Sequence, residues 1–150
     1  MSYRTKNCLT LILAVLIVLT LAFIWGNSLL DREQSTEVSM GLLDKIEPYL
    51  ALFGIEPEDD HILRKLAHFC EFGLLGLELA LLVWLRLNLS LRSLLLAAAA
   101  SLAVAVTDET LQYFTGRSCQ LSDVLLDFSG AVCGIVGIWI ISLFIKKSVS

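Results

Sequence analysis

From Cys8 to Gly26 the sequence reads CLTLILAVLIVLTLAFIWG, and no residue in this stretch carries a charge. A helix of this length rises about 28 Å at about 1.5 Å per residue, close to the roughly 30 Å hydrocarbon core of a bilayer. Basic residues in front of it resemble the start of a signal peptide, but bulky side chains at its end (Phe23, Ile24, Trp25) leave no clear small-residue cleavage site. The stretch is therefore expected to be a retained transmembrane helix.

Three further apolar stretches follow. The four stretches are expected to form transmembrane helices over residues 8–26, 66–85, 91–111 and 124–145. The chain has 150 residues, 57% hydrophobic and 17% charged, whereas soluble domains average about 45–50% apolar and about 25% charged residues. This composition excludes a soluble domain, and the length leaves no room for a second domain beside four spans. The sequence predicts an all-α, polytopic membrane protein that forms one domain over residues 1–150.

The charges that flank the spans predict their orientation. Basic residues with no acid beside them lie on one side of the expected spans: Arg4, Lys6, Arg86, Arg92, Lys146 and Lys147. Because an excess of Lys and Arg marks cytoplasmic loops, both termini are expected in the cytoplasm of a multi-pass plasma-membrane protein embedded in the lipid bilayer. Every Asp and Glu except Glu78 then falls on the outer side. Nucleic acid is not an expected partner, because topology accounts for these flanking basic residues.

The outer segment between the first two spans, residues 27–65, is too long for a simple turn. Its apolar residues recur at helical spacing, with charged residues between them: Val38, Leu42, Ile46, Tyr49 and Phe53. An amphipathic helix over residues 38–53, on the membrane surface or as a lid over the bundle, and a solvated connector both fit this pattern. Pro48 would bend such a helix or begin a second one. The stretch from Glu56 to Asp60 is expected to be an exposed turn.

The second span carries polar side chains that a lipid-facing helix does not tolerate. His68, Glu71 and Glu78 lie on one stripe of the expected helix, with Leu75 between them. Counting from Arg86 at the inner boundary, Glu71 falls in the outer leaflet and Glu78 near the midplane. An acid at the bilayer centre costs about 2.5–3.5 kcal/mol. These residues are therefore expected to face the interior of the bundle.

The outer ends of the third and fourth spans carry acids as well. Asp108 lies one helical turn before Gln112, and Asp123 lies one turn before Asp127. Since all of these residues and His68 fall at the outer ends of their spans, they are expected to form one outward-facing polar cluster.

The turn between these two spans supplies a counter-charge, and the fourth span supplies a packing motif. Arg117 is expected to pair with Asp108, Glu109 or Asp123, because its planar guanidinium binds carboxylates in a bidentate manner. Gly130 and Gly134 form a GxxxG motif, which lets another helix approach closely.

This polar cluster has a chemical and a structural interpretation. The candidate catalytic residues are His68, Glu71, Asp108, Glu109, Arg117 and Asp123, and the candidate ligand-binding residues are Lys65, Gln112 and Asp127. In the chemical interpretation, His68 or a carboxylate is a general base, Arg117 holds a phosphate or carboxylate, and a divalent cation such as Mg²⁺ or Ca²⁺ suits the acids. In the structural one, a salt-bridge network closes the outer end of the bundle. No nucleophile is identified among Ser118, Cys119 and Ser122.

Three motifs in this region are typical of one family. They are Lys65-xx-His68-Phe69-xx-Phe72-xxx-Gly76, Asp108-Glu109-xx-Gln112-xxx-Gly116-Arg117 and Asp123-Val124-xx-Asp127-xx-Gly130-xxx-Gly134. Together with the serines at positions 28, 35 and 39, they make the sequence resemble the VanZ-like family over nearly its whole length. Many members of that family have Asn at the position of Asp127, so the acid here adds a charge that favours a metal ion or an extra proton.

The resemblance implies a small integral membrane protein of the cell envelope. The founding member of the family is linked to low-level resistance to teicoplanin, a glycopeptide antibiotic that binds cell-wall precursors. The resemblance therefore implies that the outer face binds, or acts on, a wall precursor or another lipid-linked ligand and contributes to glycopeptide tolerance. The alternatives are a non-catalytic assembly or regulatory subunit and a transporter that relays an ion through Glu78.

The four cysteines show no spacing that is typical of a zinc site or a CxxC motif. Cys8, Cys70 and Cys133 lie in or at the ends of apolar stretches, where a free thiol acts as a small hydrophobic group. Cys119 falls in the outer turn and is expected to be reactive or paired, with Cys70 as the candidate partner.

Overall fold

A computed structural model describes residues 2–52, 61–87, 89–117 and 119–149. The described residues form five helices and no strand: α1 (Tyr3–Ser28), α2 (Arg32–Ala51), α3 (His61–Leu87), α4 (Leu91–Phe114) and α5 (Leu121–Val149). All except α2 are long and apolar enough to cross a membrane. The prediction of an all-α protein with four transmembrane helices is confirmed. The helices extend beyond the predicted apolar stretches, because polar residues continue them at their ends.

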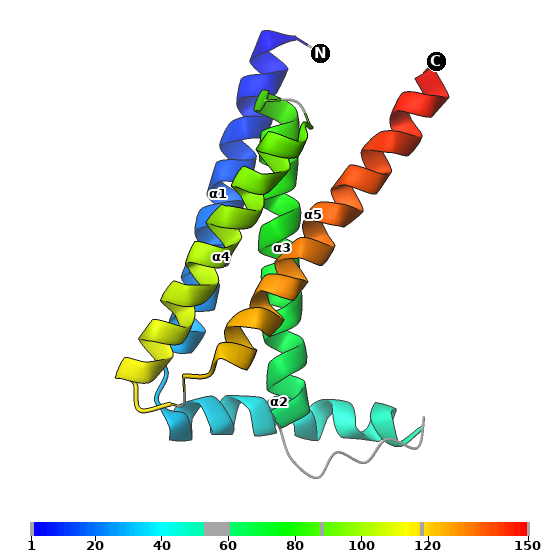
Figure 1. The fold of residues 1–150 in the computed structure, drawn as a ribbon. Coiled ribbons are helices and arrows are strands. Elements are labelled where there is room, and N and C mark those ends of the chain that lie inside the picture. Colours follow the sequence, from blue (N-terminus) through cyan, green and yellow to red (C-terminus); the bar gives the residue numbers. More distant parts are fainter. Residues whose placement is uncertain (1, 53–60, 88, 118, 150) are drawn as a thin grey trace.

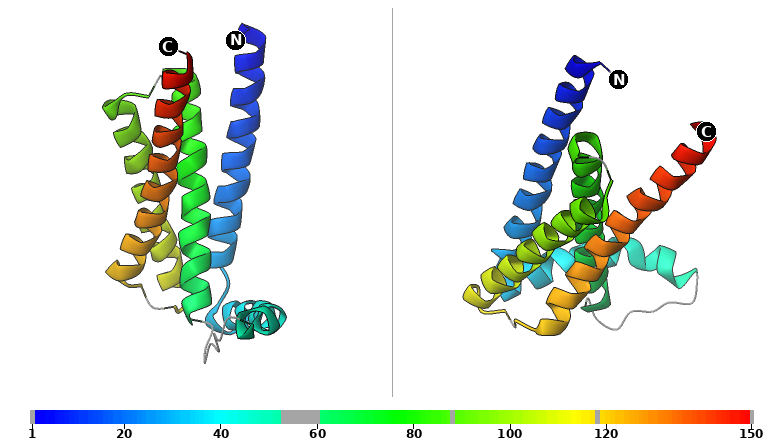
Figure 2. Two further views of the ribbon diagram at one scale, coloured as in Figure 1. Left: turned by 90° about the vertical axis from the view of Figure 1, so that its right-hand side faces the viewer. Right: turned by 45° about the horizontal axis from the view of Figure 1, so that its top comes forward.

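The four long helices form a bundle, and α2 lies across one end of it (Figure 1). Both termini and the connection from α3 to α4 lie at the opposite end, which we call the terminus end. The connection from α4 to α5 lies at the end that α2 crosses, which we call the α2 end. Figure 2 shows α2 nearly end-on, below α1 and beside the first turn of α3. The central helix is α3, since it contacts each of the others.

Glycines bring α3 and α5 into backbone contact. A Cβ atom added at Gly76 would overlap the backbone of Ala131, one at Gly130 would overlap Phe69, and one at Gly134 would overlap Gly73. The predicted close approach at Gly130 and Gly134 is confirmed. With so little space between the two helices, their ends at the α2 end of the bundle are fixed relative to each other, which positions the polar residues just beyond the glycines.

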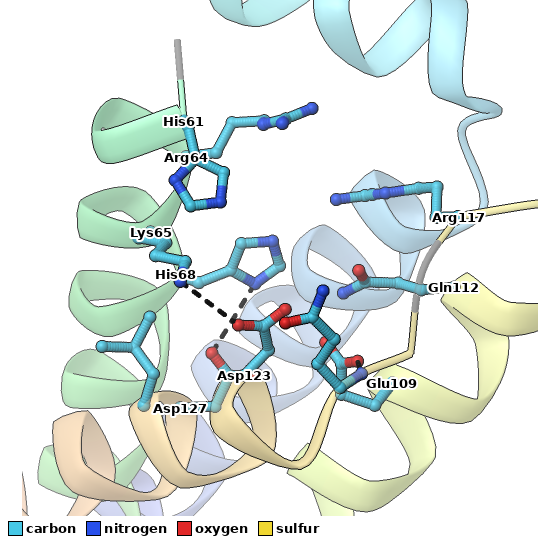
Figure 3. A pocket seen from close by; sticks show the side chains of 11 residues that line it. His61, Arg64, Lys65, His68, Glu109, Gln112, Arg117, Asp123 and Asp127 are labelled. Carbon is cyan, nitrogen blue, oxygen red and sulfur yellow. Dashed lines mark hydrogen bonds and ion pairs between the residues drawn. The ribbon is translucent and has the colours of Figure 1, made fainter. Parts of the chain in front are cut away.

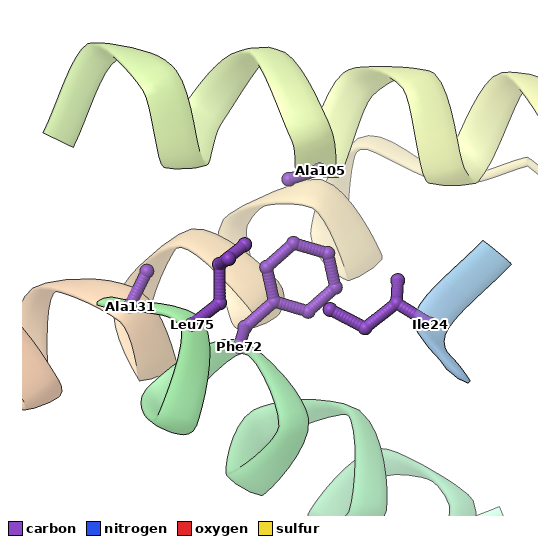
Figure 4. Packing of buried hydrophobic residues seen from close by; sticks show 5 residues of the cluster. All are labelled: Ile24, Phe72, Leu75, Ala105 and Ala131. Atoms are coloured by element: carbon purple, nitrogen blue, oxygen red, sulfur yellow. The ribbon is translucent and has the colours of Figure 1, made fainter. Parts of the chain in front are cut away.

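The apolar core is built around these contacts. At its centre, Phe72 and Leu75 of α3 pack against Ile24 of α1, Ala105 of α4 and Ala131 of α5 (Figure 4). Outside this core, large apolar side chains remain exposed along the long helices, and most of α1 is exposed. Exposed apolar surface on this scale is expected of helices that face lipid.

The segment between α1 and α3 contains a helix, as the amphipathic interpretation predicted, but α2 begins earlier, at Arg32. It continues through Pro48 to Ala51, so the expectation that Pro48 begins a second helix is wrong. One proline removes a single backbone hydrogen bond, and only one further turn follows it. The side chain of Tyr49, Phe53 and the predicted turn from Glu56 to Asp60 lie outside the described residues.

Candidate functional site

The predicted polar residues line a cavity of about 110 Å³ at the α2 end, where α3, α4, α5 and the α4–α5 turn meet (Figure 3). We call it the polar pocket. Its lining residues are His61, Arg64, Lys65, His68, Glu109, Gln112, Arg117, Gln120, Asp123, Leu126 and Asp127. The structure therefore brings together most of the predicted residues from α3, α4 and α5. Asp108 does not line the cavity but lies next to His68, which does.

His68 lies between two buried carboxylates at the floor of the polar pocket. Its Nδ1 atom is 3.9 Å from Oδ2 of Asp108 and 3.8 Å from Oδ1 of Asp127. Both acids are almost fully buried, with exposed fractions of 0% and 1%. These distances are too long for hydrogen bonds, so the three side chains surround a small polar space. Nδ1 of His68 therefore has no hydrogen-bond partner among the described residues.

Asp108 is held by two neutral donors. The hydroxyl of Ser28, in the last turn of α1, donates to Oδ1 at 2.5 Å, and the side-chain amide of Gln112 donates to Oδ2 at 2.8 Å. The side chain of Thr115 in turn donates to the carbonyl oxygen of Ser28 at 3.2 Å. The end of α1 is therefore tied to α4, and the orientation of the Asp108 carboxylate is fixed.

The two other acids of the polar pocket also have partners. Asp123 Oδ1 lies 3.6 Å from the Lys65 ammonium, in a partly exposed ion pair between α5 and α3. Glu109 accepts a hydrogen bond of 3.2 Å from the backbone N–H of Gln120. Neither acid depends on an arginine for its counter-charge or hydrogen bond.

Arg117 does not form the bidentate carboxylate pair that the sequence predicted. Among the described residues it makes no ion pair, and its guanidinium donates to the carbonyl oxygen of Asn27 at 3.4 Å. The prediction fails because Asp108, Glu109 and Asp123 already have closer partners.

The turn that carries Arg117 is a regular helix C-terminus. Gly116 has a φ of +77°, and the N–H of Arg117 donates to the carbonyl oxygen of Gln112 at 3.0 Å. This combination is a Schellman motif, in which glycine adopts the left-handed conformation without strain. The motif fixes the backbone at Arg117.

A second arginine, Arg64, faces Arg117 from the opposite side. The two side chains extend toward each other above His68 (Figure 3). Burial, followed by the positive charge of Arg64, lowers the pKa of the Arg117 guanidinium from its ordinary value, whereas nearby Asp108, Glu109 and Asp123 raise it. The mouth of the polar pocket therefore holds two arginines close enough to repel each other.

Two predicted acids of α3 point away from the polar pocket. Glu71 accepts a hydrogen bond of 3.1 Å from the side chain of Asn27, and Glu78 accepts one of 3.1 Å from Thr20. Both contacts join α3 to α1. His68 therefore lies against Asp108 and Asp127 rather than against Glu71, and Glu78, 4% exposed, faces the bundle as expected.

An apolar groove adjoins the polar pocket. It has a volume of about 250 Å³ and runs between α1, α2 and α3. Its accessible surface is mostly apolar, from side chains such as Phe23, Leu30, Val38, Leu42 and Leu63, although polar side chains such as Ser35, Ser39 and Glu71 line it as well. Arg64, His68 and Arg117 line both spaces. A polar cavity and an apolar groove thus meet at the same three side chains.

Several residues of this region were not among the predicted site residues. Arg64 lies one turn before His68 on the same face, a spacing that identifies it in retrospect. Asn27 and Ser28 lie just past the predicted end of the first span, and their spacing in the sequence does not indicate which residues they contact.

All four cysteines, Cys119 included, are free and exposed, so the candidate disulfide with Cys70 is not formed. Ser118 lies outside the described residues.

The sequence matches the VanZ/LLP1 family over residues 8–144. The chain therefore belongs to this family, as its motifs predicted. No match was found among curated proteins or among solved structures. Together with the four membrane-spanning helices, family membership defines a VanZ-like, multi-pass membrane protein.

Proposed function

We propose that this VanZ-like protein binds an anionic, lipid-linked ligand of the cell envelope at the outer face of the plasma membrane, and that this binding contributes to glycopeptide tolerance. The observation that carries the proposal is the pair of arginines, Arg64 and Arg117, that face each other over the polar pocket. A lipid-linked cell-wall precursor is the ligand class that we favour, because it joins a phosphate-bearing head group to a long apolar chain.

The charges at the mouth of the polar pocket support a phosphate-bearing head group. An anion between Arg64 and Arg117 would interact favourably with both guanidinium groups, each of which can bind phosphate oxygens in a bidentate manner. The cavity of about 110 Å³ exceeds the roughly 10–15 Å³ that one water molecule requires. It has room for a phosphate or diphosphate group, whereas attached sugars or a peptide would remain outside.

The apolar groove supports a ligand with a hydrocarbon chain. Because Arg64, His68 and Arg117 line both the groove and the polar pocket, a head group held by the arginines could extend its chain directly along α2. Apolar burial contributes about 25 cal/mol per Å² of surface removed from water. The chain would therefore add affinity that a free phosphate ion lacks.

The positions of the flanking basic residues support an outward-facing pocket. Arg4, Lys6, Arg86 and Arg92 all belong to the terminus end of the bundle. Since Lys and Arg are enriched in cytoplasmic loops, we infer that both termini are cytoplasmic. The polar pocket at the α2 end would then meet ligands at the outer leaflet.

A second candidate function is a non-catalytic assembly or regulatory subunit in which the polar cluster only holds the helices together. One observation favours it: Asp108 is fully buried, and both of its oxygens accept hydrogen bonds from Ser28 and Gln112. Asp108 then acts as a packing residue. In that case, substitution of the arginines at the pocket mouth would change neither ligand binding nor tolerance.

The proposal is tested by binding measurements on the purified full-length protein in nanodiscs. Farnesyl diphosphate is the probe, with farnesol and inorganic pyrophosphate as the matched ligands that lack the head group or the chain. We expect farnesyl diphosphate to bind more tightly than either. Arg117→Ala should weaken its binding by about tenfold to a hundredfold, the equivalent of about 1.5–3 kcal/mol for a hydrogen bond to a charged group.

Arg86→Ala is the control, because Arg86 lies at the terminus end and donates to Asn7 rather than lining the polar pocket. It should bind farnesyl diphosphate like the wild type. In cells, Arg117→Ala should lower teicoplanin tolerance at unchanged protein abundance, and Arg86→Ala should not. Equal binding by wild type and Arg117→Ala would overturn the proposed ligand, and equal tolerance would overturn the proposed cellular role.

A further inference from the structure

We infer that His68, Asp108 and Asp127 form a binding site for a divalent transition-metal ion, Mn²⁺ or Zn²⁺, at the floor of the polar pocket. The three residues come from α3, α4 and α5, and one donor atom of each lies within 4.8 Å of the other two. The role of such an ion beneath an anionic head group rests on the proposed function, whereas its binding can be measured without any lipid.

The donor atoms of His68, Asp108 and Asp127 are too far apart to form hydrogen bonds with one another, but their separations are close to those between ligands of one metal ion. Nδ1 of His68 lies 3.9 and 3.8 Å from the nearer oxygens of Asp108 and Asp127, beyond hydrogen-bonding range. Tetrahedral coordination with bonds of about 2.1 Å separates donor atoms by about 3.4 Å. The two distances from His68 exceed that separation by about 0.4–0.5 Å. The donor atoms of the two acids, which lie within 4.8 Å of each other, would have to approach by at most about 1.4 Å.

Buried polar atoms without partners supply an independent observation. Asp127 is 1% exposed, and its Oδ2 atom has no hydrogen-bond partner among the described residues; Nδ1 of His68 is likewise buried without one. A buried carboxylate with no compensating partner is strongly unfavourable. A divalent ion between the two acids would neutralise both carboxylates and use the unpaired nitrogen.

The surroundings of Asp108 are those of an oriented metal ligand. Ser28 and Gln112 donate hydrogen bonds to its two oxygens, and such second-layer contacts commonly fix the orientation of ligating carboxylates. Oδ2 can accept from Gln112 and still bind an ion, because a carboxylate oxygen has two lone pairs. The backbone contact between α3 and α5 at Gly130 also limits how far His68 can move from Asp127.

The donor set determines which ions fit. Mg²⁺ and Ca²⁺ prefer oxygen donors alone, so the imidazole nitrogen of His68 favours Mn²⁺ or Zn²⁺, which accept nitrogen together with carboxylate oxygen. Three protein ligands leave at least one position for water or a ligand. Since His68 and Asp127 line the polar pocket, that position would face the space between the arginines, where a phosphate oxygen could occupy it.

A proton shared by His68 and the acids is the competing explanation for the same arrangement. The two explanations differ in whether the protein, stripped of metal with a chelator, takes up an ion. Full-length protein in detergent should bind one Mn²⁺ or Zn²⁺ per chain in calorimetry and elemental analysis. Bound Mn²⁺ should show coupling to one histidine nitrogen in pulsed electron paramagnetic resonance.

Asp127→Asn and His68→Ala should each weaken metal binding at least tenfold, while Glu37→Gln, an acid exposed on α2, should bind like the wild type. If either site variant fails to fold, the coupling of Mn²⁺ to a histidine nitrogen in the wild type still shows whether a histidine binds the ion. Absence of ion uptake by the wild type, or uptake without histidine coupling, would overturn the metal site. If the protein took up no ion but bound farnesyl diphosphate, the proposed function would stand and the metal site would fail. If it took up an ion but did not bind farnesyl diphosphate, the metal site would stand and the proposed function would fail.

Discussion

The contact between α3 and α5 makes Gly134→Ala a sharp test of how the site is held. The added Cβ would overlap the carbonyl oxygen of Gly73 and lie 2.7 Å from the backbone nitrogen of Leu77. Both are backbone atoms, so a side-chain rotation cannot relieve the overlap and the helices must separate. Overpacking of this kind costs about 1–3 kcal/mol. The free energy of unfolding should fall by about that amount, a factor of about 5 to 150 in the folding equilibrium.

Gly137→Ala is the matched control, because Gly137 lies one turn further along α5 and an added Cβ there meets no atom within 4 Å. Replacing a helical glycine with alanine in open space is expected to be neutral or slightly stabilising. Both variants are compared by unfolding of the detergent-solubilised protein. Gly134→Ala should also weaken ligand binding, since it separates His68 from Asp127. Equal stability of the two variants would contradict the backbone contact between α3 and α5 and the positioning of His68 and Asp127 that depends on it.

Three further predictions concern single contacts. Ser28→Ala should lower the free energy of unfolding by about 1–3 kcal/mol, because it removes a hydrogen-bond donor from the buried Asp108 carboxylate. In the same unfolding assay Thr10→Ala should have little effect, because it removes an exposed hydroxyl that is bonded only within α1. Lys65→Met should change stability by less than about 1 kcal/mol, since its ion pair with Asp123 is partly exposed; a larger loss in thermal unfolding would contradict this. Desolvation and the nearby acids Glu109 and Asp123 raise the pKa of the Cys119 thiol. Maleimide should therefore label Cys119 more slowly at pH 7 than it labels an ordinary exposed thiol. The difference in labelling rate should shrink as the pH rises and the thiolate forms.

One physical reason explains why the sequence predicts both the four spans and the polar cluster that the structure contains. A charged or polar side chain in a transmembrane helix must face the interior of the bundle. The stripes that contain His68, Asp108 and Asp127 therefore had to converge once four spans were identified. The close packing at Gly130 and Gly134 could be predicted because glycine has no side chain to keep the neighbouring helix away.

The partner of each side chain could not be predicted in the same way. Cross-helix contacts depend on how each helix is rotated about its axis, and a sequence does not fix that rotation to within one side chain. Arg117 was expected to pair with an acid, but Ser28, Gln120 and Lys65 reach those acids first. Ser28 itself was missed as a partner because α1 continues past Gly26 and brings the hydroxyl to Asp108.

The side of the membrane that the polar pocket faces is tested most directly by labelling Cys119. This thiol is exposed in the α4–α5 turn at the α2 end, and replacing the other three cysteines with alanine makes it the only target. A membrane-impermeant maleimide, applied to intact cells in a mildly alkaline medium that increases the thiolate fraction, should label it without lysis. A cysteine introduced at Ser2, at the terminus end, should react only after lysis. Labelling of Cys119 only after lysis would put the polar pocket in the cytoplasm and contradict the proposed function.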